Sequence, residues 1–223
     1  MSHLPNLDAL DADGAIRHAA ETAGLHRGDF LKKGLLAGGG LLAGGALLNG
    51  YLADAEAAIS RHRSKRNDVK ILNYALTLEY LEAAFYAQAV TNKAFGSSAA
   101  LKAFAETVAD HEAAHVVFLK KALGSAAIKS PRFDFGDAVT DQTKFAATAQ
   151  TLEDTGVNAY LGQVGNVSQR AVLSAAGTIA TVEARHAAWI RDINGAGPAP
   201  AAFDVPKSEK AILKAVTATG FIT

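Results

Sequence analysis

One sequence pattern occurs twice in this chain and limits its fold more than any other feature. In each copy, a Leu-Glu pair has a tyrosine seven residues after its glutamate, and the next apolar segment holds a glutamate and a histidine three positions apart. Residues with that spacing lie on one face of an α-helix. The repeat therefore predicts two related pairs of helices. Its members are Glu79, Tyr86, Glu112 and His115 in the first copy and Glu153, Tyr160, Glu183 and His186 in the second.

The region from Asn67 onward has the periodicity of helices. Apolar residues recur there at intervals of three and four, and strand-like alternation is almost absent. Glycine-containing breaks separate the segments, and a residue suited to capping a helix precedes each one. The candidate caps are Asn67 or Asp68, Ser97 or Ser98, Asp141, and Ser168. The pattern predicts four long helices, over 67–93, 98–123, 141–164 and 168–194.

The lengths of the connections predict how these helices are arranged. The first and third connections are short, so each joins two antiparallel neighbours. The middle connection, 124–140, has 17 residues and reaches about 55 Å when extended, which is enough to run the length of a bundle. One long crossover between two hairpins is the ferritin-like connectivity. We therefore predict an all-α fold, a ferritin-like four-helix bundle over 67–194.

The repeated glutamates are expected at one depth in this bundle. In an antiparallel hairpin, two residues equally far from the turn lie level with each other. Glu79 and Glu112 are equally far from the turn near Gly96, and Glu153 and Glu183 are equally far from Ser168. Four carboxylates and two imidazoles are thus expected to meet near the middle of the bundle, where it is driest.

Metal ions explain such a cluster best. Unpaired buried carboxylates are costly or take up protons, whereas two divalent cations would neutralise four of them. The chain has no cysteine, so the ligands must be carboxylates and imidazoles, which suit iron and manganese. A glutamate on two helices and Glu-x-x-His on two others is the arrangement of di-iron carboxylate bundles. We predict two iron ions, with manganese as the alternative, bound by Glu79, Glu112, His115, Glu153, Glu183 and His186.

Several neighbouring residues are candidates for supporting roles. Glu82 lies one turn from Glu79 and is a further candidate ligand or supporting acid, although its counterpart in the second copy is Gly156. Tyr86 and Tyr160 are expected either to hydrogen-bond to the ligands or to belong to the apolar core.

A competing interpretation starts from His111. Together with Glu112 and His115 it forms His-Glu-x-x-His, the signature of zinc hydrolases. The second Glu-x-x-His, at Glu183 and His186, favours a two-metal site instead, because a zinc protease does not need a second copy of this motif. In a two-metal site, His111 is expected to support a ligand or to face solvent.

Residues 67–223 resemble the ferritin-like family that includes bacterial exported proteins and plant desiccation-related proteins. The resemblance lies in the segments LNYALTLEYLEAAFY, DHEAAHVVFLKKALG, LEDTGVNAYLG and VEARHAAWIRDING, and in the trailing AAFDVPKSEKAILKAV. It implies a ferritin-like bundle with all six ligand positions kept, related to rubrerythrins, bacterioferritins and manganese catalases. It does not imply a particular reaction.

The two ends of the chain are expected to lie outside the bundle helices. Residues 1–58 have the order of an export signal, a basic stretch before the apolar run 34–48. Within it, Arg-Gly-Asp-Phe-Leu-Lys from Arg27 resembles the twin-arginine motif, with Gly28 in place of the second arginine. We predict export to the periplasm or cell envelope; the alternative is a cytoplasmic protein whose N-terminal segment packs as a helix or linker. The tail 195–223 is expected to pack on the bundle, with Ser208 capping a short helix and Phe203 and Phe221 as apolar anchors.

The predicted function is that of a di-metal oxidoreductase. Reaction of iron with oxygen or hydrogen peroxide would make the protein a ferroxidase or a peroxide-detoxifying, stress-protective protein. The alternatives are peroxide disproportionation at manganese, a structural or stress-binding bundle that metal only holds together, and, least favoured, a zinc hydrolase. Lys and Arg balance Asp and Glu at 22 each, which argues against nucleic acid as a partner. A homo-oligomer is compatible with the sequence, but the two terminal extensions disfavour a storage cage.

Overall fold

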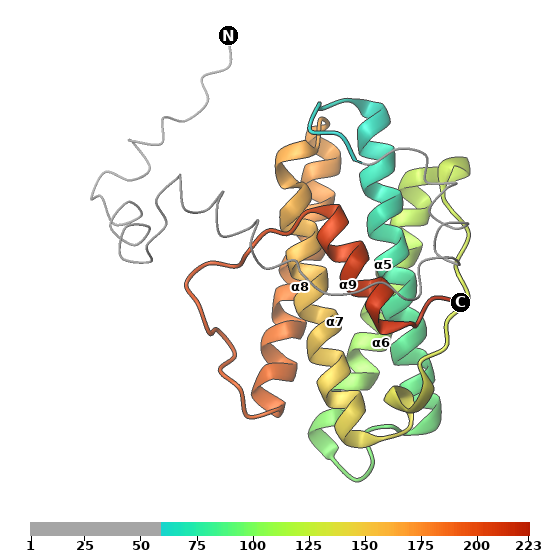
Figure 1. The fold of residues 1–223 in the computed structure, drawn as a ribbon, viewed down its shortest axis with the longest axis vertical. Helices are drawn as coiled ribbons and strands as arrows, with labels where there is room; N and C mark the ends of the chain where they lie inside the picture. The colour runs from blue at the N-terminus through green and yellow to red at the C-terminus, as the bar shows by residue number, and fades with distance from the viewer. Residues whose placement is uncertain (1–58) are drawn as a thin grey trace. The chain divides into compact units, whose positions relative to one another are not determined.

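The computed structural model describes residues 59–223. Within that range the chain forms five α-helices and three short 3-10 helices, with no extended strand (Figure 1). The N-terminal extension 1–58, with its candidate export signal, lies outside the described residues. No helix in 59–223 combines the length and hydropathy that crossing a membrane requires.

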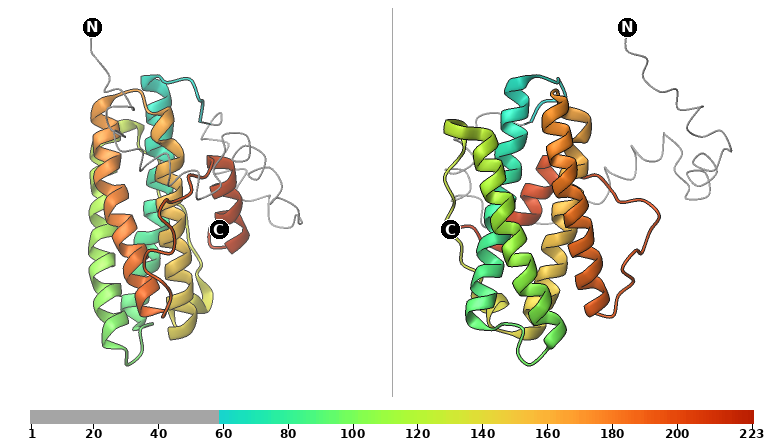
Figure 2. Two further views of the ribbon diagram at one scale, coloured as in Figure 1. Left: turned by 90° about the vertical axis from the view of Figure 1, so that its left-hand side faces the viewer. Right: turned by 180° about the vertical axis from the view of Figure 1, so that it is seen from behind.

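Four long helices form the bundle, and two hairpins build it. α5 packs along α6 and α7 packs along α8, each pair antiparallel (Figure 1, Figure 2). The bounds are α5 Lys65–Asn92, α6 Ala99–Leu123, α7 Gln142–Gln163 and α8 Arg170–Ile193. The predicted all-α four-helix bundle is confirmed, and every predicted helix boundary lies within two residues of the observed one.

The N-terminal caps follow the prediction at α6 and α7 but not at α5. Ser98 and Asp141 cap α6 and α7, since their side chains accept hydrogen bonds from backbone N–H groups in the first turn. Neither Asn67 nor Asp68 caps α5. Ser64 does, by accepting a hydrogen bond from the N–H of Asn67, and α5 therefore begins before the predicted position.

The predicted cap of α8 is also wrong, for a tertiary reason. Ser168 does not cap α8, and the residue at its N-cap position, Gln169, makes no side-chain cap. The carboxylate of Asp68 on α5 accepts hydrogen bonds from the N–H groups of Ser168, at 2.7 Å, and Gln169, at 2.9 Å. This fully buried carboxylate satisfies donors at the start of α8 and joins the two hairpins.

The long crossover runs along α5. It contains the 3-10 helices η1 Gly124–Ala126 and η2 Gly136–Val139. Asn73 of α5 holds its first part, because its side-chain amide donates to the carbonyl of Ala126 and accepts from the N–H of Ile128. The crossover therefore returns the chain to the far end of the bundle, where α7 begins (Figure 1).

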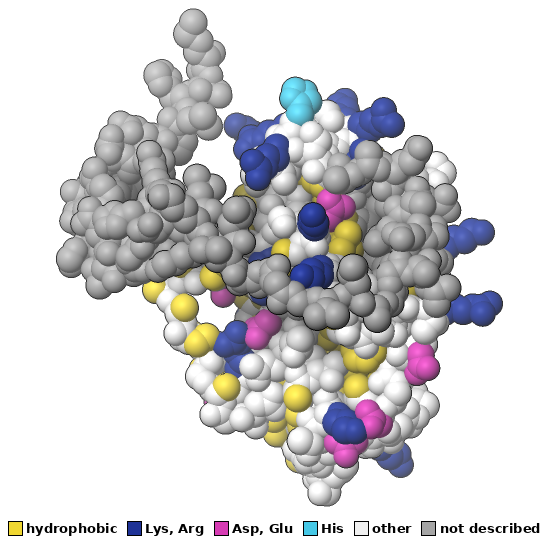
Figure 3. Space-filling view, viewed as in Figure 1, with side chains coloured by type: hydrophobic (Ala, Val, Ile, Leu, Met, Phe, Trp, Pro, Cys, Tyr) yellow, Lys and Arg dark blue, Asp and Glu magenta, His cyan; other side chains and the backbone are white. Residues whose placement is uncertain are grey.

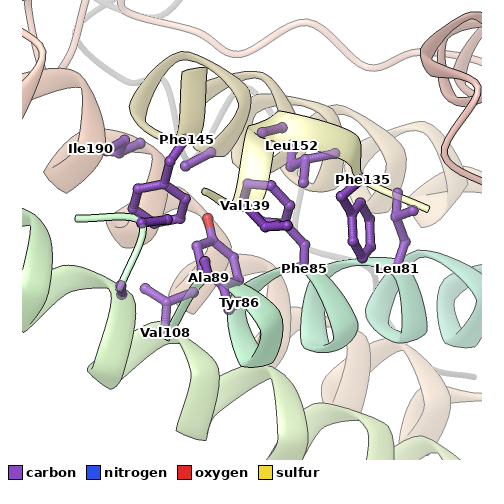
Figure 4. Close-up of a cluster of buried hydrophobic side chains, with 14 of the residues drawn as sticks. Leu81, Phe85, Tyr86, Ala89, Val108, Phe135, Val139, Phe145, Leu152 and Ile190 are labelled. Atoms are coloured by element: carbon purple, nitrogen blue, oxygen red, sulfur yellow. The ribbon is translucent and has the colours of Figure 1, made fainter. Parts of the chain in front are cut away.

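Two apolar clusters fill the interior, and the repeated glutamates lie between them. Along α5, Leu76 belongs to one cluster and Phe85 to the other. Figure 4 shows the second cluster, in which the ring of Phe85 stacks on Phe145 of α7 with centroids 5.5 Å apart. Glu79 lies between Leu76 and Phe85 in the sequence, so the polar layer is held by packed side chains on both sides.

The C-terminal tail ends in α9 Glu209–Thr219, capped by Ser208 as predicted. Ile212 and Val216 of α9 are almost fully buried, and α9 contacts α7. Phe221 stacks edge-on against Phe135 of the crossover. Phe203 is 47% exposed, so the prediction that it anchors the tail is wrong, because apolar side chains of α9 fill that role.

The surface shows one local concentration of charge that the balanced composition does not reveal. The sequence 61–66, Arg-His-Arg-Ser-Lys-Arg, precedes and begins α5. Figure 3 shows basic side chains gathered at the end of the bundle where α5 starts. This end is therefore positive although the chain as a whole is neutral.

Gly162 offers a test of how the tail is held. A Cβ atom at Gly162 would lie 1.8 Å from the carbonyl oxygen of Lys207, whose N–H donates to the carbonyl of Asn158. We expect Gly162→Ala to lower the free energy of unfolding by about 1–3 kcal/mol, because α7 and the tail would be forced apart. Chemical denaturation measures this change. Gly177→Ala is the control, since its Cβ would meet nothing within 4 Å; an equal loss in both variants would contradict the account.

Candidate metal centre

All six side chains of the predicted ligand set meet inside the bundle. Each of the four long helices supplies a glutamate, and α6 and α8 each add the histidine one turn further on. The four glutamates have no exposed surface, and His186 is 3% exposed. The side chain of His115 is 12% exposed. The depth argument from the two hairpins thus places these residues correctly.

The six side chains form two groups that overlap. Each group offers four ligand atoms, all within 4.8 Å of one another. The first group is Glu79, Glu112, His115 and Glu183, and the second is Glu112, Glu153, Glu183 and His186. Glu112 and Glu183 belong to both. Each group has in addition one glutamate and one histidine of its own, so each could hold a metal ion.

The distances show why protein groups alone do not satisfy this site. The Nδ1 atom of His115 lies 3.1 Å from oxygens of both Glu79 and Glu112 and 3.2 Å from one of Glu183. The Nδ1 atom of His186 lies 3.2 Å from oxygens of Glu112 and Glu153. A ring nitrogen carries one proton at most, so it cannot donate to every oxygen that faces it.

Several atoms of the cluster have no hydrogen-bond partner among the described residues. They are Oε1 of Glu112, Oε2 of Glu153, both carboxylate oxygens of Glu183 and Nδ1 of His186. Buried polar atoms are nearly always paired, and leaving one unpaired is costly. These atoms belong to the two candidate groups, and carboxylate oxygen with imidazole nitrogen is a donor set suited to iron or manganese. The residues present therefore fit a metal centre.

Electrostatics require the metal-free cluster to hold protons. Burial and repulsion from neighbouring carboxylates raise the pKa of Glu112 and of Glu183 well above the usual value. Burial alone would lower the pKa of His115, but the carboxylates of Glu112, Glu183 and Glu79 raise it to about 12. Burial opposes ionisation of Glu79, yet its hydrogen bond with His115 leaves its pKa below the usual value. Cations can replace these protons.

The two repeated tyrosines connect the hairpins through the site. The hydroxyl of Tyr86, on the first hairpin, donates to Oε1 of Glu153 on the second. The hydroxyl of Tyr160, on the second hairpin, donates to Oε1 of Glu79 on the first. Both rings are also buried. Each tyrosine thus occupies one carboxylate oxygen, while the other oxygen faces a histidine.

Glu82 lies beside the cluster but belongs to neither candidate group. It is 3% exposed, and burial together with the charges of Glu183 and Glu153 raises its pKa well above the usual value. A Cβ atom at Gly156 would lie 3.2 Å from Oε2 of Glu183 and 3.4 Å from Oε1 of Glu82. The glycine that replaces Glu82 in the second copy of the repeat leaves room for the Glu82 carboxyl.

His111 contacts the ligand set from outside. Its Nδ1 atom is 2.9 Å from Nε2 of His186, and the two rings stack with centroids 5.1 Å apart. His115 belongs to the first candidate group and His186 to the second. Neither group within 59–223 contains His111. This arrangement argues against a zinc site built on both histidines of the His-Glu-x-x-His sequence. His111 contacts His186 and is itself exposed to solvent.

The comparison with protein families agrees with the fold. Residues 67–196 match the model of the ferritin-like domain family, and the chain belongs to that family. A search of curated proteins found no match to this chain.

His111 tests how the site orients its histidines. With Nδ1 of His186 directed at the cluster, the hydrogen bond to Nε2 fixes the ring. We expect His111→Ala to weaken metal binding by about 10–100-fold, measured by competition with a chelator of known affinity. His62→Ala, at an exposed histidine before α5, should bind as the unchanged protein does. Unaltered affinity in His111→Ala would show that His186 needs no partner.

The pH dependence of stability tests the electrostatics of the metal-free protein. Carboxyl groups with raised pKa hold protons in the folded state that the unfolded chain releases, so they lose stabilisation as pH rises above about 4.5. The raised pKa of His115 likewise makes stability fall as pH rises between 6.5 and about 12. The lowered pKa of Glu79 makes stability rise with pH instead. The melting temperature of chelator-treated protein should therefore fall from about pH 6 to about pH 9.

A variant and the loaded protein serve as comparisons for this experiment. Glu82→Gln removes one of the carboxyl groups with a raised pKa, so the melting temperature should fall less steeply with pH. In the metal-loaded protein the trend should weaken or reverse, because protons compete with the metal for its ligands. A metal-free melting temperature that rises across this range would contradict the assignment.

Proposed function

We propose that the site holds two iron ions, one in each ligand group, and that Glu112 and Glu183, which belong to both groups, would serve as ligands in both. The observation that supports this is the overlap of two four-residue groups through two shared glutamates. Four carboxylates carry the charge that two divalent cations neutralise, and the buried atoms without a hydrogen-bond partner belong to these glutamates and to His186. The four-helix frame sets the positions of these side chains.

We further propose that the protein oxidises ferrous iron with dioxygen or hydrogen peroxide. When bound, each ferrous ion supplies one electron, so that two electrons and two protons convert dioxygen to hydrogen peroxide, or hydrogen peroxide to two waters. The protein's own residues hold the carboxylates in place through Tyr86 and Tyr160 and bury them away from bulk water. Reaction with hydrogen peroxide would remove both ferrous iron and a damaging oxidant, which fits a protective role, whereas reaction with dioxygen would remove ferrous iron but yield hydrogen peroxide.

Metal stoichiometry in variants tests the assignment of ligands. Glu79→Ala and Glu153→Ala each remove a ligand from one group only, so each should reduce binding from about two iron ions per chain to about one. Glu183→Ala removes a shared ligand and should abolish tight binding of both. Metal analysis after gel filtration measures these contents. Glu106→Ala, at an exposed residue paired with Lys102, should retain both ions; a full complement in Glu183→Ala would refute the proposal.

The oxidation reaction is tested by adding ferrous iron and air to metal-free protein. A ferric absorbance should develop faster than in buffer and level off at about two iron ions per chain. Oxidation at the rate of buffer alone would reject the redox function. If metal still raised the melting temperature in that case, the site would serve to hold the helices together.

Manganese is the second candidate metal, because the same oxygen and nitrogen donors accept it. Two manganese ions would support disproportionation of hydrogen peroxide into dioxygen and water. An oxygen electrode distinguishes this activity: manganese-loaded protein should evolve oxygen from peroxide, and Glu183→Ala should not. No oxygen evolution from the manganese-loaded chain would leave iron as the proposed metal.

A further inference from the structure

An apolar cavity of about 60 Å³ lies next to the carboxylate cluster. Its lining comes mainly from α5, α7 and α8 and consists largely of aliphatic side chains and small residues. Among them are Leu72 and Ala75 of α5, Ala159 of α7, and Ala176 and Ala180 of α8. Small residues on three helices leave the space open. We call it the Tyr160 cavity, after the residue that connects it to the cluster.

Tyr160 belongs to both the cavity and the metal centre. Its side chain lines the cavity, while its hydroxyl donates a hydrogen bond to Oε1 of Glu79. Leu78, the neighbour of Glu79 in the sequence, also lines the cavity. At the other side, Val164 is 49% exposed and Leu173 is 39% exposed, and both contribute to the lining. The cavity thus extends from surface residues near the α7–α8 turn to a side chain that contacts the ligand set.

The chemistry of the lining selects what the cavity can hold. A buried water needs two to four polar partners, and apolar cavities stay dry. Hydrogen peroxide, with two O–H groups, has the same requirement. Two other lining residues carry polar groups, Tyr74 and Gln163. The hydroxyl of Tyr74 is buried without a hydrogen-bond partner among the described residues, and Oε1 of Gln163 already accepts a hydrogen bond from Asn166, so the lining stays largely apolar. A small uncharged molecule without donors is the ligand that this cavity accommodates.

We propose that the Tyr160 cavity binds dioxygen and delivers it past Tyr160 to the metal centre. The delivery step rests on the proposed function. The cavity would bring the oxidant to the metal centre on the side of Glu79. Because its lining is apolar, it favours dioxygen over hydrogen peroxide. The assignment of a dioxygen site depends on the volume, the lining and the contact with Tyr160, none of which requires a bound metal.

Xenon binding tests the cavity in metal-free protein. Xenon is an uncharged apolar probe that occupies dry cavities. Crystals of the full chain under xenon pressure should show an atom between α5, α7 and α8, adjacent to Tyr160. Ala176→Leu should lose it, because the added atoms fill the space, and Ala180→Val is a smaller second filling. Ala171→Leu, at an exposed position of the same helix, should keep it. No xenon at this place in the unchanged protein, or xenon retained in Ala176→Leu, would overturn the proposal.

Oxidation kinetics test delivery. In Ala176→Leu, ferrous oxidation at limiting dioxygen should be about tenfold slower, equivalent to about 1.4 kcal/mol, while iron content and the rate with hydrogen peroxide stay unchanged. If Ala176→Leu slowed ferrous oxidation equally with dioxygen and with hydrogen peroxide, or slowed it with neither, delivery through the cavity would be overturned. Failure of the unchanged chain to oxidise iron would reject the proposed function and delivery together, whereas a xenon site would still support the binding site.

Discussion

The burial of four carboxylates at one level of the bundle is the constraint on which the rest of the structure depends. No lysine or arginine reaches them among the described ion pairs; their partners are two histidines and two tyrosines. Negative charge at that density is stable only with protons or cations. The apolar clusters on either side supply the packing that keeps the glutamates together. Burying the carboxylates therefore lowers the stability of the fold, and the packed core around them keeps them in place.

The two halves of the site are related but not equal. Each hairpin supplies a glutamate, a tyrosine that reaches across to the other hairpin, and a Glu-x-x-His pair. The first half also has Glu82, for which Gly156 of the second half leaves space. His111 supports only His186, and the Tyr160 cavity lies on the side of Glu79. An ion in the first group would therefore have the more apolar surrounding, whereas Glu82, whose pKa is raised by burial and by the charges of Glu183 and Glu153, lies toward the second group.

Much of the fold and of the candidate site could be predicted from the sequence, because both depend on regular helix geometry. The i, i+3 spacing and equal distances from the turns set the positions of the six side chains, and helix periodicity set the boundaries. The exceptions depend on contacts between distant segments. Asp68 accepts hydrogen bonds from the two residues before a helix that begins about a hundred residues later, so local rules assign it to the wrong helix. The pairing of His111 with His186 depends on how α6 and α8 are rotated. Phe203 is exposed, whereas Ile212 and Val216 of α9 are buried. The cavity arises from small residues on three helices, which no single segment reveals.

We propose that two overlapping ligand groups hold two cations at one level of the bundle. The most direct measurement is a crystal structure of iron-loaded protein with anomalous diffraction recorded on both sides of the iron absorption edge. We expect two iron peaks about 3.5–4 Å apart, with Glu112 and Glu183 contacting both. A single peak bound by His111 and His115, or no peak among the six side chains, would contradict it.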